Sequence, residues 1–414
     1  MLEDLFAADT AQRLLRSRVL GPHLDGFCTL LVGLGYRAST IRRKLWAIIG
    51  LTRWMTRRRL TAADLDERRV DTFLDARRRR GRARPGLLRT LLQLLEWLRS
   101  KGVVPTPEPT FDDSPSAALL ARYESYLGQE RALAGRTIAA YVSVARVFID
   151  ECLGGDAVRP DSLRPGDVGD FLLDRVCRMA PRRAQSMAGA LRSFLRFLFL
   201  RGETQTDLAL AVPRVRQWRL SSVPRHLPSR DVERLLRACD RSSAMGRRDH
   251  AVLLLLARLG LRAGEVLAIE LDDLRWREGE IVIRGKGLVY DRLPLLPDVG
   301  KALALYLEKA RPPGRSRRVF LCARAPHGGF AHPSTVSTIV AHALARAGLT
   351  PAMRGAHLLR HSLATALLRR GASMAEIGQV LRHRSPSTTE IYAKLDFDAL
   401  RDVAAPWPTT GGAR

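Results

Sequence analysis

Two stretches of the chain repeat the same order of apolar and polar positions, about one hundred residues apart. STIRRKLWAIIGLTRWM, from Ser39, is matched by RTIAAYVSVARVFIDEC, from Arg136, and VDTFLDAR around Phe73 is matched by VGDFLLDR around Phe171. Apolar residues recur at helical spacing in both stretches, and each stretch ends at a glycine that follows a basic residue. The pattern predicts two copies of a bundle of about four helices. Chance similarity between amphipathic helices is the alternative, and the matched order of several features favours a duplication.

The last part of the chain, from about residue 227, has helical spacing with one interruption. In EIVIRGKGLVYDRLPLL, Ile281 and Ile283 alternate with other residues before a Gly-Lys-Gly turn, and Leu293 and Leu295 alternate after it. Alternation on both sides of a tight turn is typical of a β-hairpin. We therefore predict a third, mostly helical domain with one small sheet.

Proline-rich segments divide the chain. Val103–Ser116 contains four prolines and no apolar periodicity, and the segment before residue 228 alternates proline and arginine, so both are interpreted as linkers. A chain of 414 residues is too long for one ordinary core. We predict a mainly α, multidomain fold with helical bundles at 1–104 and 116–204, a linker at 205–226, the mixed domain at 227–398 and a tail at 399–414.

The positive charge of the chain indicates a polyanionic partner. Lys and Arg number 69 against 42 Asp and Glu, which gives a net charge of +27, and a field of that size attracts nucleic acid. A GC-rich coding sequence explains the preference for arginine over lysine, but it does not explain the excess of positive charge. In the run ARRRRGRARP, Arg77, Arg78, Arg79 and Arg80 are candidate phosphate contacts, and a solvated loop is the alternative.

Cysteines and apolar runs indicate a cytoplasmic protein. The five cysteines are scattered without a CxxC pair, which argues against a disulfide framework or a zinc knuckle and suits a reducing cytosol. The segment MLEDLFAADT is acidic and lacks the apolar core of a signal peptide. The longest apolar runs are too short to span a bilayer, so we expect no membrane partner.

Six residues of the predicted third domain have side chains that could take part in catalysis. They are Arg262, Lys286, His357, Arg360, His383 and Tyr392. Taken singly, an arginine here is unremarkable, a histidine and an arginine three apart on a helix are more often a surface feature, and a tyrosine beside an isoleucine is ordinary packing. A lysine in a turn is usually solvated, but lysine is scarce in this chain, so the Gly-Lys-Gly turn indicates a selected residue.

Together these residue types suit the cleavage of a phosphodiester without a metal ion. Two arginines form a permanently charged, forked clamp for the non-bridging oxygens. A lysine can give a proton to the departing 5′-oxygen, and a histidine can accept or steer the proton of an attacking tyrosine. A covalent phosphotyrosine conserves the bond energy, so strands can be rejoined without ATP, and we expect no cofactor.

The order Arg, Lys, His-x-x-Arg, His, Tyr resembles the tyrosine recombinase (integrase) family. ARLGLRAGEV is similar to its first arginine box, HLLRHSLAT to its second, and LRHRSPSTTEIY to its final His-to-Tyr segment. The resemblance is strong from about residue 227 to 400 and weaker over 116–202, where it implies a core-binding domain. The sequence departs from the family pattern at Arg382, where glycine is usual, and residues 1–104 go beyond the minimal two-domain plan.

The resemblance implies a role for each of the six residues. Arg262 and Arg360 would bind the scissile phosphate, and Lys286 would be the general acid. His357 would assist proton transfer, His383 would support the phosphate and the tyrosine, and Tyr392 would be the nucleophile that forms a 3′-phosphotyrosyl link.

The resemblance also implies an architecture and partners. We expect the two bundles and the catalytic domain to form a clamp around double-stranded DNA recombination sites. From the residues themselves, Arg292 is a further candidate DNA contact, and Arg382 would either contact DNA or crowd its turn. A homotetramer in the bacterial cytosol and nucleoid would exchange strands through a Holliday junction during integration, excision or transposition of a mobile element. Partner recombinases or DNA-bending proteins would assist, and the tail with Trp407 would dock on a neighbouring subunit or pack within its own.

Two other functions are weighed. SMAEIGQVLRHRSPSTTEIY also suits a helix-turn-helix, which would make the chain a non-catalytic DNA-binding regulator but leaves Arg262 and Lys286 unexplained. His357 and His361 have the spacing of a zinc-binding helix, but Leu358 stands where the HExxH motif needs glutamate, so we interpret His361 as packing or as a partner of the site residues.

Overall fold

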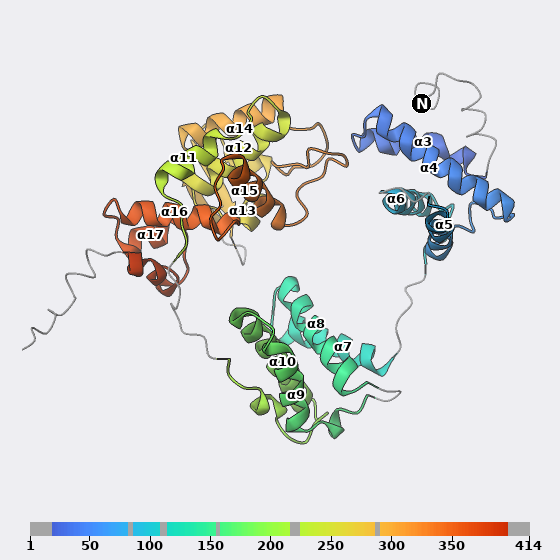
Figure 1. The fold of residues 1–414 in the computed structure, drawn as a ribbon, viewed down its shortest axis with the longest axis horizontal. Helices are drawn as coiled ribbons and strands as arrows, with labels where there is room; N and C mark the ends of the chain where they lie inside the picture. Colours follow the sequence, from blue (N-terminus) through green and yellow to red (C-terminus); the bar gives the residue numbers. More distant parts are fainter. Residues whose placement is uncertain are drawn as a thin grey trace, which may run out of the picture. The chain divides into compact units, whose positions relative to one another are not determined.

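The computed structural model describes residues 19–81, 86–107, 114–154, 158–215, 224–285 and 290–395 (Figure 1). Helices dominate these residues, and the named strands form one small sheet. The described residues between 107 and 222 form a compact unit of their own. The mainly α, multidomain fold predicted from the hydrophobic pattern is confirmed.

The first bundle is built from amphipathic helices that bury one face. In its last helix, Leu91, Leu94, Leu95 and Leu98 follow the i, i+3, i+4, i+7 spacing, and each side chain is at most 1% exposed. Asp66 caps the third helix by accepting a hydrogen bond from a first-turn N–H group. The helices are α3 (Gly21–Gly33), α4 (Ala38–Arg57), α5 (Glu67–Arg79) and α6 (Leu87–Ser100).

The second bundle has the same order of four long helices. They are α7 (Pro115–Ser125), α8 (Gly135–Cys152), α9 (Pro165–Val176) and α10 (Pro181–Leu200). Proline begins three of them, where its missing N–H group costs no hydrogen bond. The short 3-10 helix Leu208–Ala211 packs into the same core, together with Val212. The packed bundle therefore continues past residue 204, where the sequence placed its end.

Each bundle contains an equivalent contact between an arginine and a phenylalanine. The guanidinium of Arg77 lies over the ring of Phe73, 5.6 Å from its centroid, and that of Arg175 lies over Phe171 at 4.6 Å. Both phenylalanines are buried. The phenylalanines and the arginines have the same offset of 98 residues (171 − 73 and 175 − 77). This agreement supports the interpretation of the bundles as copies.

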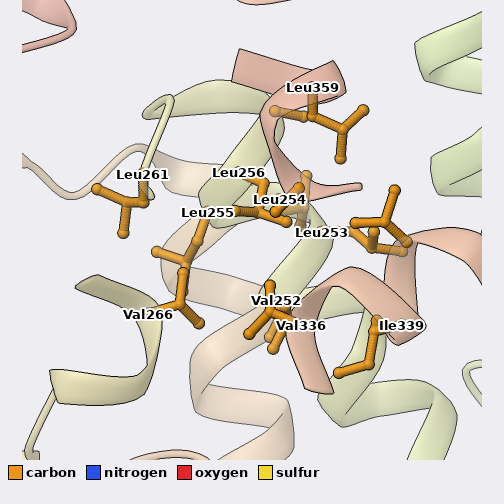
Figure 2. Close-up of a cluster of buried hydrophobic side chains, with 14 of the residues drawn as sticks. Val252, Leu253, Leu254, Leu255, Leu256, Leu261, Val266, Val336, Ile339 and Leu359 are labelled. Atoms are coloured by element: carbon orange, nitrogen blue, oxygen red, sulfur yellow. The ribbon is translucent and has the colours of Figure 1, made fainter. Parts of the chain in front are cut away.

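Helix α12 (Ala244–Arg258) runs through the centre of the third domain. Its segment AVLLLLA is apolar on every face and wholly buried, as expected of a helix enclosed by others. Leu253, Val336 and Leu359 belong to this core (Figure 2). The surrounding helices are α11 (Ser229–Arg237), α13 (Ala263–Ala268), α14 (Pro297–Lys309), α15 (Ser334–Arg346), α16 (Ala356–Leu368) and α17 (Met374–Val380).

The sheet contains the predicted hairpin and one more strand. It is antiparallel in the order β1 (Leu274–Arg275), β2 (Glu280–Arg284), β3 (Tyr290–Pro294). Ile281 pairs with Leu293, as the alternation predicted. Strand β1 was not predicted, because two residues are too few to show an alternation. Residues 286–289 at the hairpin tip lie outside the described residues.

A small cluster of buried side chains lies apart from the main core of this domain. It joins α16, α17 and the final 3-10 helix (Glu390–Leu395), and its members are Ala364, Leu368, Ile377, Leu381 and Tyr392. The predicted tail at 399–414 lies outside the described residues. Within the described ranges, none of the helices has the length and apolar character needed to cross a membrane.

Candidate active site

Gly260 directs the chain from α12 into the first arginine box. Its φ is +59°, in the left-handed region that glycine tolerates best. A Cβ atom on this residue would lie 2.8 Å from Cδ2 of Leu381 and 3.0 Å from Cδ2 of Leu363. Conformation and space therefore both require glycine here. The bend places Arg262 immediately before α13, with its side chain 39% exposed.

Glu265 fixes Arg262 from the first turn of α13. Its Oε2 atom accepts a hydrogen bond from the backbone N–H of Arg262 at 2.8 Å, and its Oε1 atom accepts one from the guanidinium of Arg262 at 2.6 Å. Burial favours a higher pKa for Glu265, but the Arg262 N–H group and the charges of Arg382 and Arg262 hold its pKa below the ordinary value. Glu265 is therefore a carboxylate at neutral pH.

Arg360 reaches the same place from α16. Its side chain is buried and donates hydrogen bonds to the backbone carbonyls of Gly260 and Leu381. Burial, followed by the charges of Arg262 and Arg382, lowers the pKa of Arg360 to about 10, so it stays protonated at neutral pH. The structure thus brings together the two arginines that the sequence predicted as a phosphate clamp.

The two predicted histidines differ in environment. His357 lies in the first turn of α16, three residues before Arg360, and is exposed. His383 is half-buried, and its Nδ1 atom lies 2.8 Å from Oγ1 of Thr389. Burial, with the charges of Arg360 and Arg262, lowers the pKa of His383 to about 4, so it is neutral at pH 7.

Tyr392 is buried and contacts His361, which the sequence analysis interpreted as packing or as a partner of the site residues. Its side chain is 1% exposed, and Nδ1 of His361 lies 2.7 Å from its Oη atom. Burial raises the pKa of Tyr392 to about 12, although the charge of Arg360 opposes this shift. Burial, followed by the charges of His357 and Arg360, lowers the pKa of His361 to about 4. The neutral imidazole of His361 is therefore the group that meets the phenol.

Arg382, predicted as a DNA contact, lies inside the domain. Its side chain is 7% exposed, and its guanidinium donates a hydrogen bond to Oε2 of Glu265 at 2.7 Å. Its backbone carbonyl accepts a hydrogen bond from Arg262 at 3.4 Å. In this structure Arg382 therefore pairs with Glu265 within the arginine cluster and presents almost no surface to a DNA strand.

The other predicted residues are distributed over the surface or undescribed. Lys286 lies outside the described residues. On β3, Arg292 is 64% exposed and its guanidinium lies 3.9 Å from a carboxylate oxygen of Glu280. At the end of α5, Arg78 pairs with Asp75, 2.8 Å away. The side chains of the last two members of the predicted patch, Arg79 and Arg80, are exposed.

The geometry weighs against the helix-turn-helix alternative. Helix α17 is seven residues long, and the chain that follows it forms the 3-10 helices Pro386–Thr388 and Glu390–Leu395. Among the described residues, the chain after α17 therefore has no α-helix that could serve as the recognition helix of that motif. In the same ranges, no three His, Cys, Asp or Glu side chains gather as a metal-binding group.

Sequence comparisons identify the family of the chain. Residues 225–398 match the model of the phage integrase family. A Sinorhizobium fredii (strain NBRC 101917 / NGR234) protein, y4rA, described as an integrase or recombinase, is 42% identical over 384 residues, which cover 92% of this chain and 93% of that protein. The tyrosine recombinase XerD of Listeria innocua is 31% identical over 292 residues, covering 69% of this chain and 96% of XerD.

Solved structures share the fold. The XerH recombinase bound to a palindromic difH substrate, after cleavage, has a TM-score of 0.55 at 19% identity and covers 76% of this chain and 94% of its own. A lambda integrase tetramer bound to a Holliday junction has a TM-score of 0.52 at 17% identity, covering 74% and 87%. The chain belongs to the phage integrase family of tyrosine recombinases. Membership implies site-specific DNA recombination.

Proposed function

We propose that this protein cleaves and rejoins DNA at specific sites through a 3′-phosphotyrosyl link to Tyr392 and a Holliday junction. One observation carries the assignment: Arg262 and Arg360, 98 residues apart (360 − 262), are held by the same two turns of backbone. Gly260 and Leu381 accept the hydrogen bonds of Arg360, and the carbonyl after Leu381 accepts that of Arg262. Two cations so placed can bind the non-bridging oxygens of one phosphate.

The reaction exchanges one phosphate ester for another. The Oη atom of Tyr392 attacks the phosphorus, the bond to the 5′-oxygen breaks, and Lys286 gives that oxygen a proton. The 5′-hydroxyl of a second strand then attacks the phosphotyrosine and releases the phenol. Each step forms one ester bond and breaks one, so strand exchange needs no ATP. The two arginines supply the positive charge at the phosphate, a role for which other enzymes use a metal ion.

The proton of Tyr392 needs an acceptor, because a phenol with a pKa of about 12 is protonated at neutral pH. His361 and His383 both have a pKa of about 4 and are therefore neutral and able to accept it. His361 already lies 2.7 Å from the phenol oxygen. We assign the transfer to His361 or His383, with exposed His357 assisting once DNA is bound.

The partner is double-stranded DNA, and the working form is a homotetramer. The net charge of +27 supports a polyanionic partner. Proteins of the same fold have been solved with a difH substrate and as a tetramer on a Holliday junction. We propose that the bundles and the catalytic domain form a clamp and that the tail docks on a neighbouring subunit. Partner recombinases or DNA-bending proteins assist the movement of a mobile element in the bacterial cytoplasm.

Replacement of the nucleophile tests this function. Y392F removes the attacking oxygen, so it should bind a nicked suicide substrate normally and give no covalent protein–DNA complex on a denaturing gel. The control is Y141F, in α8 of the second bundle, which should keep the wild-type yield of covalent complex. A normal covalent yield from Y392F would disprove the mechanism.

A further inference from the structure

Arg382 occupies a position where both the backbone conformation and the burial disfavour arginine. Its φ is +54°, in the left-handed region, which costs any residue with a Cβ atom. Its side chain is 7% exposed although arginine is rarely buried without a partner. The usual glycine of the family would meet the backbone requirement and bury no charge. The arginine therefore needs a compensating interaction.

Glu265 provides that interaction. One guanidinium nitrogen of Arg382 donates to Oε2 of Glu265 at 2.7 Å, and another donates to the carbonyls of Leu259 and Val380 at 3.4 Å. The Nε atom has no hydrogen-bond partner among the described residues, and Oδ2 of Asp291 lies 3.8 Å from it. The side chain thus crosses from its own turn to α13 and β3.

The carboxylate of Glu265 is shared between two arginines. Its Oε1 atom meets the guanidinium of Arg262, and its Oε2 atom meets Arg382 and the backbone N–H of Arg262. Without Arg382, the whole negative charge of Glu265 would act on Arg262 and weaken its attraction for a phosphate.

The formal charges of the cluster show what Arg382 adds to it. Arg262, Arg360 and Arg382 contribute three positive charges, and Glu265 contributes one negative charge, so the cluster has a net charge of +2 (3 − 1). With glycine at 382 the net charge would be +1 (2 − 1). If Asp291 is counted as well, both totals fall by one and the difference remains.

We propose that Arg382 is a positioning residue. It pairs with the carboxylate of Glu265 and so leaves the positive charge of Arg262 available to the scissile phosphate. The inference rests on the proposed function. Arg382 acts through Glu265 and does not touch the DNA, because its side chain is 7% exposed whereas that of Arg262 is 39% exposed.

The test compares two suicide substrates, one with an ordinary scissile phosphate and one with a methylphosphonate. The methylphosphonate replaces one non-bridging oxygen by a methyl group, so it carries no negative charge and needs less cationic stabilisation. The rate of covalent complex formation is measured in a single turnover at saturating protein. Wild type must form the complex and Y392F must not, which tests the proposed function separately from the role of Arg382.

R382G should slow cleavage of the ordinary site by about 10-fold or more and stay within about threefold of wild type on the methylphosphonate. R382K, which keeps the charge, should lose less. The matched control is R59G, because Arg59 is an exposed arginine with a φ of +55° in the first bundle. R59G makes the same backbone change and should leave both rates unaltered.

A second arm tests whether Arg382 acts through Glu265. In the E265Q background, R382G should slow cleavage of the ordinary site by less than about threefold, because the carboxylate that pairs with Arg382 is gone. Equal slowing of both substrates by R382G would show a merely structural role and overturn the proposal. The same cost of R382G with and without E265Q would show that Arg382 acts on the phosphate independently of Glu265, and it would overturn the proposal too.

Discussion

Tyr392 carries its hydroxyl group inside the protein, against His361. The sequence pointed to His383 as the support of the tyrosine and to His361 as packing or a partner residue. The structure adds His361 because α16 and the 3-10 helix around Tyr392 lie side by side, although the two residues are 31 positions apart. Its place next to Arg360 in the HLLRH motif was the available signal.

His361 makes stability depend on pH. Its pKa is lowered from 6.5 to about 4 in the folded protein, so the unfolded chain binds more protons between these values. The stabilisation is complete above pH 6.5 and is lost as the pH falls towards 4. The unfolding temperature of wild type should therefore fall between pH 7.5 and 5, and that of H361Q should fall less. His383 and His250, whose pKa values burial also lowers, contribute to the remaining fall.

H342Q is the control for this measurement, because His342 is exposed on α15. Its unfolding temperature should follow the wild-type dependence on pH. The interpretation of His361 fails if H361Q and wild type lose the same number of degrees over this range.

At the scale of elements, the site is assembled by backbone turns. Helix α12 ends at Gly260, whose carbonyl holds Arg360, and α17 is followed by Leu381, whose carbonyl holds the same guanidinium. Helix α13 begins after Arg262, which Glu265 fixes. The arginines are therefore aligned by the ends of three helices.

G260A should damage both stability and cleavage. The added Cβ atom meets Leu381 at 2.8 Å in a left-handed conformation, so we expect a loss of about 1–3 kcal/mol in the free energy of unfolding. Covalent complex formation should slow because the carbonyl that anchors Arg360 shifts. Thermal unfolding and single-turnover cleavage measure the two effects.

The matched change is G264A, inside α13, where a Cβ atom meets nothing within 4 Å. Alanine is the better helix former, so G264A should be neutral or stabilise by up to about 1 kcal/mol. If G260A and G264A have equal unfolding temperatures, the bend at Gly260 does not require glycine.

Periodicity predicted most of the helices and the hairpin, because amphipathic spacing reflects a buried face directly. It could not predict the interior position of Arg382. An arginine in a loop is usually solvated, and the partner that decides otherwise, Glu265, is 117 residues away in the sequence. For the same reason, the order of Arg, His and Tyr could be recognised in the sequence, while the path of each side chain could not be predicted.

At the scale of the whole molecule, the positive charge is the feature that a DNA partner would use. The net charge is +27, and the exposed arginines that end α5 add to it at one place in the first bundle. The guanidinium of Arg77 lies over the ring of Phe73, whereas the side chain of Arg78 is 64% exposed. We therefore expect the phosphate contacts at the last three arginines of that run.

The triple variant R78A/R79A/R80A should weaken DNA binding and reduce its dependence on salt. Each lost phosphate contact lowers the slope of log K against log salt by about 0.9, so we expect a reduction of up to about 2.7. Fluorescence anisotropy at several salt concentrations measures the slope, and an unchanged unfolding temperature confirms an intact bundle. An unchanged slope would assign these arginines to a solvated surface.

The separate cluster around Tyr392 has a consequence for local opening. Tyr392, Leu381 and Ile377 pack with one another and with α16, while the main core of the domain is centred on α12. Few buried contacts must break to release the final 3-10 helix, so this segment can open at a fraction of the free energy of global unfolding. Its backbone amides should exchange with deuterium sooner than those of α12, and Tyr392 could then move while the backbone turns that hold Arg360 remain folded.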